Sequence, residues 1–217
     1  MKHCWINKTE SKEVIAVFLG WGADEKSLGR MSVASCDVVA FYDYKNLDTT
    51  IDFRRYDKVY VVAWSMGVYN AECFLRQDDI QAVSKTAIAG TCMPVDDQYG
   101  LLVDICQGTY DNWADAPRRK FSMRMCGGRQ GFVDLLPLMS DRSVEDQKSE
   151  LKAIMERDKS MRVGDARWNK AIVSSSDLIF LPDNQRRFWQ GRADVVVEVD
   201  MPHFPFGVIA DWSQLLG

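Results

Sequence analysis

A serine between a predicted strand and a predicted helix is the first residue that could do chemistry. The segment Ala63-Trp64-Ser65-Met66-Gly67 follows the apolar run at 58–64 and precedes a stretch that is typical of an amphipathic helix. Nucleophile elbows usually read G-x-S-x-G, because small residues two positions from the serine avoid clashes in a strained turn. Alanine at position 63 is a small departure. Ser65 is therefore either a nucleophile or an ordinary helix cap.

A serine nucleophile needs a base, and the chain has only two histidines, His3 and His203. His3 lies near the N-terminus, where we expect a solvated side chain. His203 follows the apolar run at 193–200, which is the last predicted strand, and so agrees with the known triad order serine, acid, histidine. We favour His203 as the base. The alternative is a structural histidine packed between its neighbours Pro202 and Phe204.

The acid that orients the histidine should lie at the end of the strand before the last one. We predict that strand at 177–182, and Asp183 follows it directly. Asp183 is our first choice, although Pro182-Asp183-Asn184 is also good turn sequence. Asp200 is the second choice because it is close to His203. Asp177 would lie at the wrong end of the predicted strand.

An oxyanion hole usually combines the N–H after the nucleophile with an N–H from the loop after an early strand. Met66 and Trp21 occupy these places, and Gly20 and Gly22 would let the backbone around Trp21 approach a ligand closely. The same glycines partly resemble the dinucleotide-binding pattern G-x-G-x-x-G. That pattern fails here because its third position holds Glu25, whose size and charge oppose a pyrophosphate.

Short apolar runs should form the sheet that positions these residues; they lie at 14–19, 37–44, 58–64, 85–90, 177–182 and 193–200. Most lack polar alternation and are separated by helix-length segments. This pattern predicts an α/β fold, with a mostly parallel sheet and helices on both faces. The interval of about 101–169 shows no convincing strand and predicts a helical cap inserted into a single domain of residues 1–217. Its clearest helix covers 143–159, with Ser143 and Asp146 resembling a capping box.

Composition excludes several classes of protein. The chain has 217 residues with 47% hydrophobic and 27% charged residues, which argues against disorder. The net charge of −4 argues against a general nucleic-acid or membrane binder. The run at 14–19 is too short to span a membrane and lacks a signal-cleavage pattern, so we expect a cytoplasmic protein. The cysteines form no CxxC pair, so we predict buried free thiols and no metal site.

Four segments together resemble a known family: FLGWG (18–22), AWSMGVYNA (63–71), FLPDNQRRFW (180–189) and MPHFPF (201–206). The chain is similar to the BioG-type pimeloyl-[acyl-carrier protein] methyl ester esterases, an α/β-hydrolase group of biotin synthesis. The similarity runs from near residue 14 to the C-terminus and is weak in the cap. It implies the α/β-hydrolase fold, with Ser65 as nucleophile, His203 as base and an acid at the position read as Asp183. It also implies an oxyanion hole at Trp21 and Met66 and no cofactor.

The resemblance implies that the enzyme hydrolyses the methyl ester of pimeloyl-[acyl-carrier protein], with the carrier as its partner. Acyl-carrier proteins are acidic, so a basic cluster in the predicted cap could dock one; its members are Arg118, Arg119, Lys120, Arg124 and Arg129. A solvated helix face is the alternative. Apolar residues nearby could line an acyl channel or form core, namely Trp113, Phe132, Leu135 and Leu136. Other possible functions are a general small-ester carboxylesterase and a non-catalytic acyl-carrier or lipid-binding protein on a hydrolase scaffold.

Overall fold

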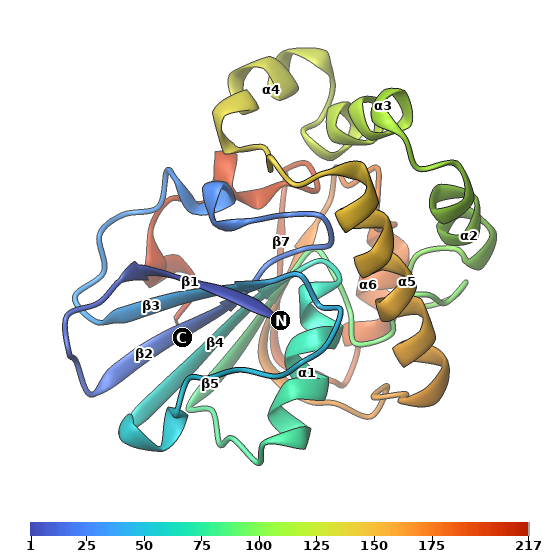
Figure 1. Ribbon diagram of the computed structural model, residues 1–217. Helices are drawn as coiled ribbons and strands as arrows, with labels where there is room; N and C mark the ends of the chain where they lie inside the picture. Colours follow the sequence, from blue (N-terminus) through green and yellow to red (C-terminus); the bar gives the residue numbers. More distant parts are fainter. Residues whose placement is uncertain (217) are drawn as a thin grey trace.

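A sheet of seven strands forms the centre of the computed structural model, which describes residues 1–216 (Figure 1). The strand order is β1-β3-β2-β4-β5-β6-β7. All neighbouring strands are parallel except β1, which pairs antiparallel with β3. The strands are β1 Lys2–Asn7, β2 Glu13–Phe18, β3 Asp37–Tyr42, β4 Lys58–Trp64, β5 Ser84–Ile88, β6 Trp168–Ser174 and β7 Ala193–Val199.

Helices connect the strands and cover the sheet. The α-helices are α1 Gly67–Gln77, α2 Val103–Asn112, α3 Asp115–Met125, α4 Arg129–Asp134, α5 Val144–Ser160 and α6 Pro182–Trp189. The 3₁₀ helices are η1 Glu25–Leu28, η2 Phe53–Arg55, η3 Leu136–Leu138, η4 Pro205–Gly207 and η5 Trp212–Gln214. Within residues 1–216, none of these helices combines the length and apolarity that a membrane crossing requires.

Strand β2 shows why the central strands lack polar alternation. Val14 and Phe18 are fully buried in a cluster shared with side chains of α1, α5 and α6. Ile15 and Val17 point the other way, into a second cluster with the C-terminal segment 201–215. The strand is thus apolar on both faces because each face has its own core.

Five of the predicted strands are confirmed as β2, β3, β4, β5 and β7. The predicted strand at 177–182 is wrong, because Asp177 Oδ1 accepts hydrogen bonds from the N–H groups of Ile179 at 2.7 Å and Phe180 at 2.8 Å. These bonds turn the chain, and Pro182 then starts α6. The strand of this region is β6, which begins inside the interval predicted to contain no strand. Its first residues include Asn169 and Lys170, which weaken the apolar signal. The edge strand β1 was not predicted either.

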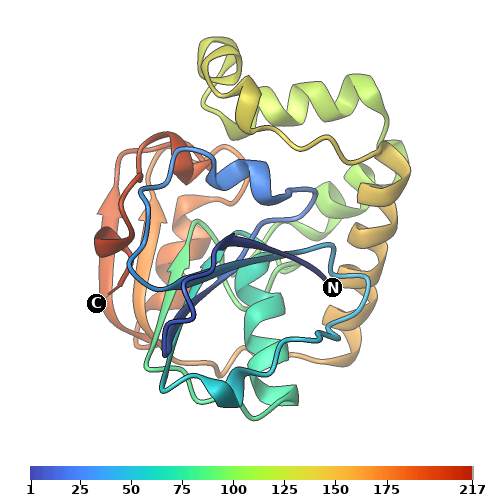
Figure 2. The same cartoon turned by 60° about the vertical axis from the view of Figure 1, so that its left-hand side comes forward.

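The predicted helical insertion lies between β5 and β6 and contains α2, α3, α4, η3 and α5. We refer to residues 103–160 as the cap. Figure 2 shows α3 and α4 at one end of the molecule, beyond the sheet. The helix predicted at 143–159 is confirmed as α5, and Ser143 Oγ caps it by accepting from Asp146 N–H at 3.1 Å. Leu151 and Ile154 of α5 are buried in the first core and so anchor the cap to the sheet.

The cysteines are all free thiols, as predicted. Cys4 is partly exposed, and the other cysteines are buried. Burial raises the pKa of Cys73 to about 11 and the pKa values of Cys106 and Cys126 to about 12. These thiols stay protonated at neutral pH and act as small apolar side chains.

Candidate active site

Ser65 occupies a tight turn between β4 and α1. Its backbone φ is 58°, in the left-handed region that non-glycine residues rarely adopt. Its N–H donates to Ile88 O at 2.9 Å, and its carbonyl accepts from Val68 N–H at 3.1 Å. The turn is therefore fixed both to β5 and to the first turn of α1. Strain held in place by surrounding contacts is typical of a nucleophile elbow.

Glycines pack against this turn where a side chain would not fit. A Cβ at Gly67 would overlap the carbonyl oxygens of Phe18 and Leu19. A Cβ at Gly90 would overlap the carbonyl of Ser65 itself. Gly67 is the second small residue of the elbow motif, whereas Gly90 was not singled out from the sequence. Only the packing of the segment after β5 against the turn reveals the role of Gly90.

His203 joins Ser65 to a buried carboxylate. Its Nε2 lies 2.9 Å from Ser65 Oγ, and its Nδ1 lies 2.7 Å from Asp177 Oδ2. Asp177 is 3% exposed and His203 is 1% exposed, so water does not compete for these bonds. A carboxylate that accepts from Nδ1–H leaves Nε2 free to accept the serine proton. His3, the other histidine, lies on β1.

Further contacts hold the histidine and the carboxylate in this arrangement. Trp64 Nε1 donates to the carbonyl of His203 at 2.8 Å, and the two rings are 5.6 Å apart. Gln185 Nε2 donates to Asp177 Oδ2 at 3.0 Å. Neither Trp64 nor Gln185 was predicted as a site residue. The sequence offers no direct signal for them, because Trp64 contacts a residue far along the chain and the Gln185 contact depends on the turn that follows Asp177.

The choice of Asp183 as the partner of His203 is corrected by the structure. Asp183 lies in the first turn of α6 with its side chain 81% exposed, and it pairs with Arg186 Nη1 at 2.6 Å. The second choice, Asp200, instead accepts from Ser176 Oγ at 2.6 Å. The physical reason is the misplaced strand: β6 ends at Ser174, so the loop that follows it holds Asp177 rather than Asp183.

The two predicted oxyanion-hole residues lie beside Ser65. Trp21 and Met66 line a cavity of about 20 Å³ together with Ser65 and His203. Within residues 1–216, the backbone N–H groups of Trp21 and Met66 donate to no protein acceptor. Both donors are therefore available to an oxygen atom of a bound molecule.

A larger chamber of about 490 Å³ lies between the cap and the sheet. Of the apolar residues proposed for a channel, Trp113, Phe132 and Leu136 line this chamber, whereas Leu135 is buried in the second core. Residues that border both the chamber and the Ser65 cavity are Trp21, Trp64, Phe121 and Met125. The two spaces thus adjoin, and their shared walls are mostly aromatic, as in many sites for apolar ligands.

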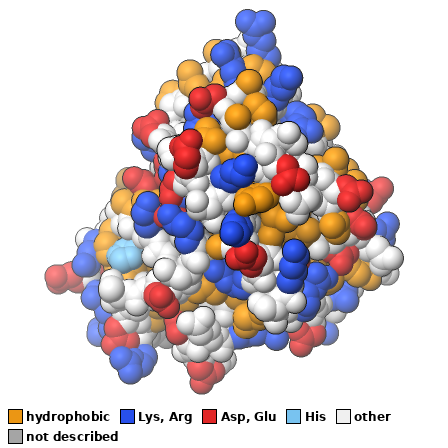
Figure 3. All heavy atoms as spheres, turned by 45° about the vertical axis from the view of Figure 1, so that its right-hand side comes forward, with side chains coloured by type: hydrophobic (Ala, Val, Ile, Leu, Met, Phe, Trp, Pro, Cys, Tyr) orange, Lys and Arg blue, Asp and Glu red, His pale blue; other side chains and the backbone are white. Residues whose placement is uncertain are grey.

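The predicted basic cluster lies on α3 and α4. Arg118 is half-buried: it pairs with Asp115 at 2.9 Å and donates to the carbonyl of Arg142 at 3.0 Å. The other members are exposed, namely Arg119, Lys120, Arg124 and Arg129. Arg118 is the only member with an ion pair within residues 1–216. Figure 3 shows Lys and Arg side chains gathered at the top of the molecule, so this end carries positive charge on a chain whose net charge is −4.

Proteins of known structure share the fold that carries this site. A lipase-esterase related protein from Clostridium acetobutylicum has a similar structure, with a TM-score of 0.68 at 13% identity, over 95% of this chain and 93% of that chain. Esterases and other hydrolases recur among the structural neighbours. At this low identity the likeness concerns the fold alone, and the fold is the α/β-hydrolase fold.

Two relatives are more similar in sequence. A malonyl-[acyl-carrier protein] O-methyltransferase of Bacteroides fragilis is 37% identical over 195 residues, which are 89% of this chain but 40% of that protein's length. The crystal structure of BioG from Haemophilus influenzae is 32% identical, covers 100% of both chains and has a TM-score of 0.93. The family model described as pimeloyl-ACP methyl esterase BioG matches residues 1–215. The chain therefore belongs to the BioG family.

Proposed function

We propose that this protein is a serine carboxylesterase that hydrolyses the methyl ester of pimeloyl-[acyl-carrier protein]. The observation that carries the proposal is the contact series from Ser65 Oγ through His203 to Asp177 at the junction of the strands and the cap. Membership of the BioG family supports the choice of substrate. The products would be methanol and pimeloyl-carrier with a free carboxylate.

The mechanism follows from the positions of the groups. As Ser65 Oγ attacks the ester carbonyl carbon, His203 Nε2 takes its proton, and Asp177 stabilises the resulting imidazolium. The N–H groups of Trp21 and Met66 bind the oxyanion. His203 then returns the proton to the departing methoxy group, which leaves as methanol. A water molecule activated by the same Nε2 attacks the acyl-enzyme and releases the carboxylate and Ser65.

The chamber and the basic cluster support a long substrate that comes from a carrier. An apolar chamber beside the Ser65 cavity suits a methylene chain whose ester end reaches the nucleophile. Arg118 and Arg119 also line this chamber, and the rest of the cluster continues along α3 and α4. An acidic carrier that docks on these exposed cations would deliver its acyl chain from the same end of the molecule.

The test has two steps. Labelling of the folded protein with a fluorophosphonate, followed by peptide mapping, should place the adduct on Ser65, and Ser65→Ala should abolish it. Hydrolysis of methyl pimeloyl-carrier should then exceed that of p-nitrophenyl butyrate in kcat/KM. An unlabelled Ser65 would contradict any serine esterase. If Ser65 is labelled but kcat/KM is higher for p-nitrophenyl butyrate, the results would instead support a general small-ester carboxylesterase.

A further inference from the structure

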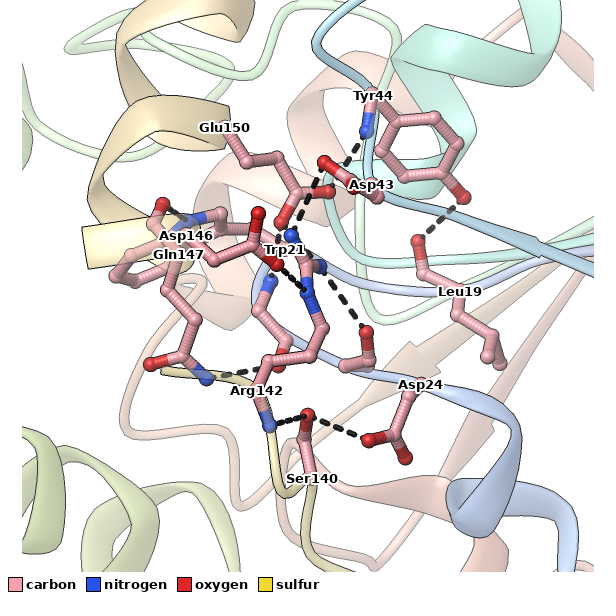
Figure 4. Close-up of polar contacts among 12 residues, drawn as sticks. Leu19, Trp21, Asp24, Asp43, Tyr44, Ser140, Arg142, Asp146, Gln147 and Glu150 are labelled. Atoms are coloured by element: carbon pink, nitrogen blue, oxygen red, sulfur yellow. Dashed lines mark hydrogen bonds and ion pairs between the residues drawn. The ribbon is translucent and has the colours of Figure 1, made fainter. Parts of the chain in front are cut away.

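Side chains of α5 bind the loop that carries the Trp21 N–H (Figure 4). The N–H of Gly22 donates to Glu150 Oε2 at 3.0 Å, and its carbonyl accepts from Gln147 Nε2 at 2.9 Å. The indole Nε1 of Trp21 donates to the main-chain carbonyl of Gln147 at 2.7 Å. The cap helix therefore holds both the side chain and the following backbone of the proposed oxyanion-hole residue.

These contacts fix the polar groups on both sides of the Trp21 N–H. The Gly20 carbonyl shares a planar peptide unit with that N–H, and it accepts from Ala23 N–H at 3.2 Å. The next peptide unit is held through Gly22 N–H by Glu150. Gly22 has a φ of 75°, and a Cβ built there lies 3.2 Å from the Gln147 amide. The orientation of the Trp21 N–H is thus set from both neighbouring peptides, while the N–H itself has no protein acceptor within residues 1–216.

Glu150 is the centre of this arrangement. It is fully buried, and each carboxylate oxygen accepts a backbone N–H: Oε2 that of Gly22, and Oε1 that of Tyr44 at 3.0 Å. Arg142 Nη1 lies 2.7 Å from Oε2. A buried carboxylate requires such a partner, because an unpaired charge away from water is costly. The carboxylate of Glu150 therefore connects three parts of the molecule, namely the end of β3, the loop after β2 and the cap.

Arg142 extends the contact around the loop. It is 9% exposed, and its Nη1 also donates to the Ala23 carbonyl at 3.2 Å. Its Nε donates to Asp146 Oδ2 at 2.8 Å, and its Nη2 lies 3.2 Å from Asp43 Oδ1. The guanidinium thus binds the loop two residues beyond Trp21, and it opposes the rise that burial causes in the pKa of Glu150.

We propose that Glu150, paired with Arg142, is a positioning residue for the oxyanion hole. Through the Gly22 N–H it sets the direction of the Trp21 N–H, so stabilisation of the oxyanion depends on the seating of the cap helix α5. This inference rests on the proposed esterase function. Glu150 lies outside the Ser65 cavity. We infer that it affects the stability of the transition state rather than the binding of the substrate.

The test compares Glu150→Gln with Glu72→Gln in the full-length protein. The N–H groups of Gly22 and Tyr44 bind different oxygens of Glu150, so a glutamine there presents an NH₂ donor to one of them, and it also removes the charge that faces Arg142. Glu72 is a matched control: it is a buried glutamate of α1 that binds Arg76, Lys85 and Trp168 Nε1. None of its partners lines the Ser65 cavity.

The readouts are kcat and KM for p-nitrophenyl butyrate, together with Ki for a trifluoromethyl ketone whose oxyanion mimics the transition state. Glu150→Gln should lower kcat about 10- to 100-fold and raise Ki by a similar factor, with KM changed less than about 2-fold. Glu72→Gln should keep all values within about 2-fold of wild type. A merely structural role would lower thermal stability without moving kcat and Ki together.

If Glu150→Gln folds and has the kcat and Ki of the wild type, the inference about Glu150 is overturned, while the proposed function is unaffected. Absence of Ser65-dependent hydrolysis in the wild type would overturn the proposed function, and the inference with it. If Glu150→Gln does not fold, Glu150→Asp provides the second test, since it keeps the carboxylate that faces Arg142 but shortens its reach to the Gly22 N–H. Its kcat and its affinity for the ketone should fall together, and unchanged values of both would overturn the inference.

Discussion

Asp177 Oδ2 lies 2.7 Å from His203 Nδ1, while Oδ1 of the same carboxylate accepts the N–H groups of Ile179 and Phe180. One side chain therefore turns the chain from β6 into α6 and also faces the histidine. The turn fixes the carboxylate before any substrate binds, so the histidine faces an oxygen atom whose position is set by the backbone.

Replacing Asp177 should impair the reaction much more than replacing Asp183. In Asp177→Asn the amide oxygen can keep the bonds to the turn, but the NH₂ group then faces His203 Nδ1 and cannot accept its proton. The imidazole would favour the wrong tautomer, and kcat should fall by about 10⁴-fold. Steady-state kinetics on the methyl ester measures this loss.

The control is Asp183→Asn, which removes the same charge from an exposed carboxylate that pairs with Arg186. Its kcat should stay within about 2-fold of wild type, because exposed ion pairs contribute little. Similar losses in both variants would contradict the assignment of Asp177 as the partner of the histidine.

Gly67→Ala should destabilise the protein, because a Cβ there overlaps the Phe18 and Leu19 carbonyls. Backbone cannot move aside as a flexible side chain can, so the free energy of unfolding should fall by about 1–3 kcal/mol. Gly108→Ala is the opposite case: it lies in α2, and a Cβ there meets nothing within 4 Å. It should raise stability by up to about 1 kcal/mol, because alanine favours helix. Urea denaturation measures both changes, and a stable Gly67→Ala would argue against the tight elbow.

Reversing exposed charges of the basic cluster should weaken the use of carrier-bound substrate. We expect the double variant Lys120→Glu with Arg129→Glu, two exposed members that do not line the chamber, to raise KM for methyl pimeloyl-carrier and to leave p-nitrophenyl butyrate unaffected. Arg118 is a poorer choice, since it also binds the carbonyl of Arg142. The effect should shrink at high salt, where exposed charges are screened.

Lys12→Glu with Arg54→Glu supplies the control for total charge. Both residues are exposed, and they precede β2 and β4, at the opposite end of these strands from Ser65. An equal rise in KM in this control, or an equal loss on the small ester in the cluster variant, would rule out docking through the cluster.

Asp158 should make stability depend on pH. It is buried near the end of α5, and burial raises its pKa to about 6, with a smaller contribution from Asp96, while Arg162 opposes the shift. A carboxyl whose folded pKa lies above its unfolded value stabilises the folded state below about pH 4, and this contribution is lost as pH rises through about 6. The difference in unfolding free energy between wild type and Asp158→Asn should therefore fall between about pH 4 and pH 7. Urea denaturation across this range checks it, and a constant difference would contradict it.

The sequence by itself determined the elements that are local in the chain. The apolar runs of β2 and β4 are confirmed, because strands buried on both faces are continuously apolar wherever they lie. The apolar run of β7 is confirmed too, although β7 is an edge strand whose valines are largely exposed. The elbow around Ser65 was recognisable from its local motif, although the structure shows that a glycine is needed at position 67 because the Phe18 and Leu19 carbonyls approach it closely. His203 was found by elimination, since the chain has only two histidines.

Only the tertiary structure decided which acid faces the histidine and what holds the loop that carries the Trp21 N–H. Asp177 and Asp183 both follow apolar segments, and the difference between them depends on where β6 pairs in the sheet. Glu150 is an ordinary helix residue in sequence, yet it is fully buried between Gly22 and Arg142. The Asp177–His203 contact joins residues 26 apart in the chain and the Glu150–Gly22 contact joins residues 128 apart, and a one-dimensional pattern of residue types does not record which distant groups a side chain will meet.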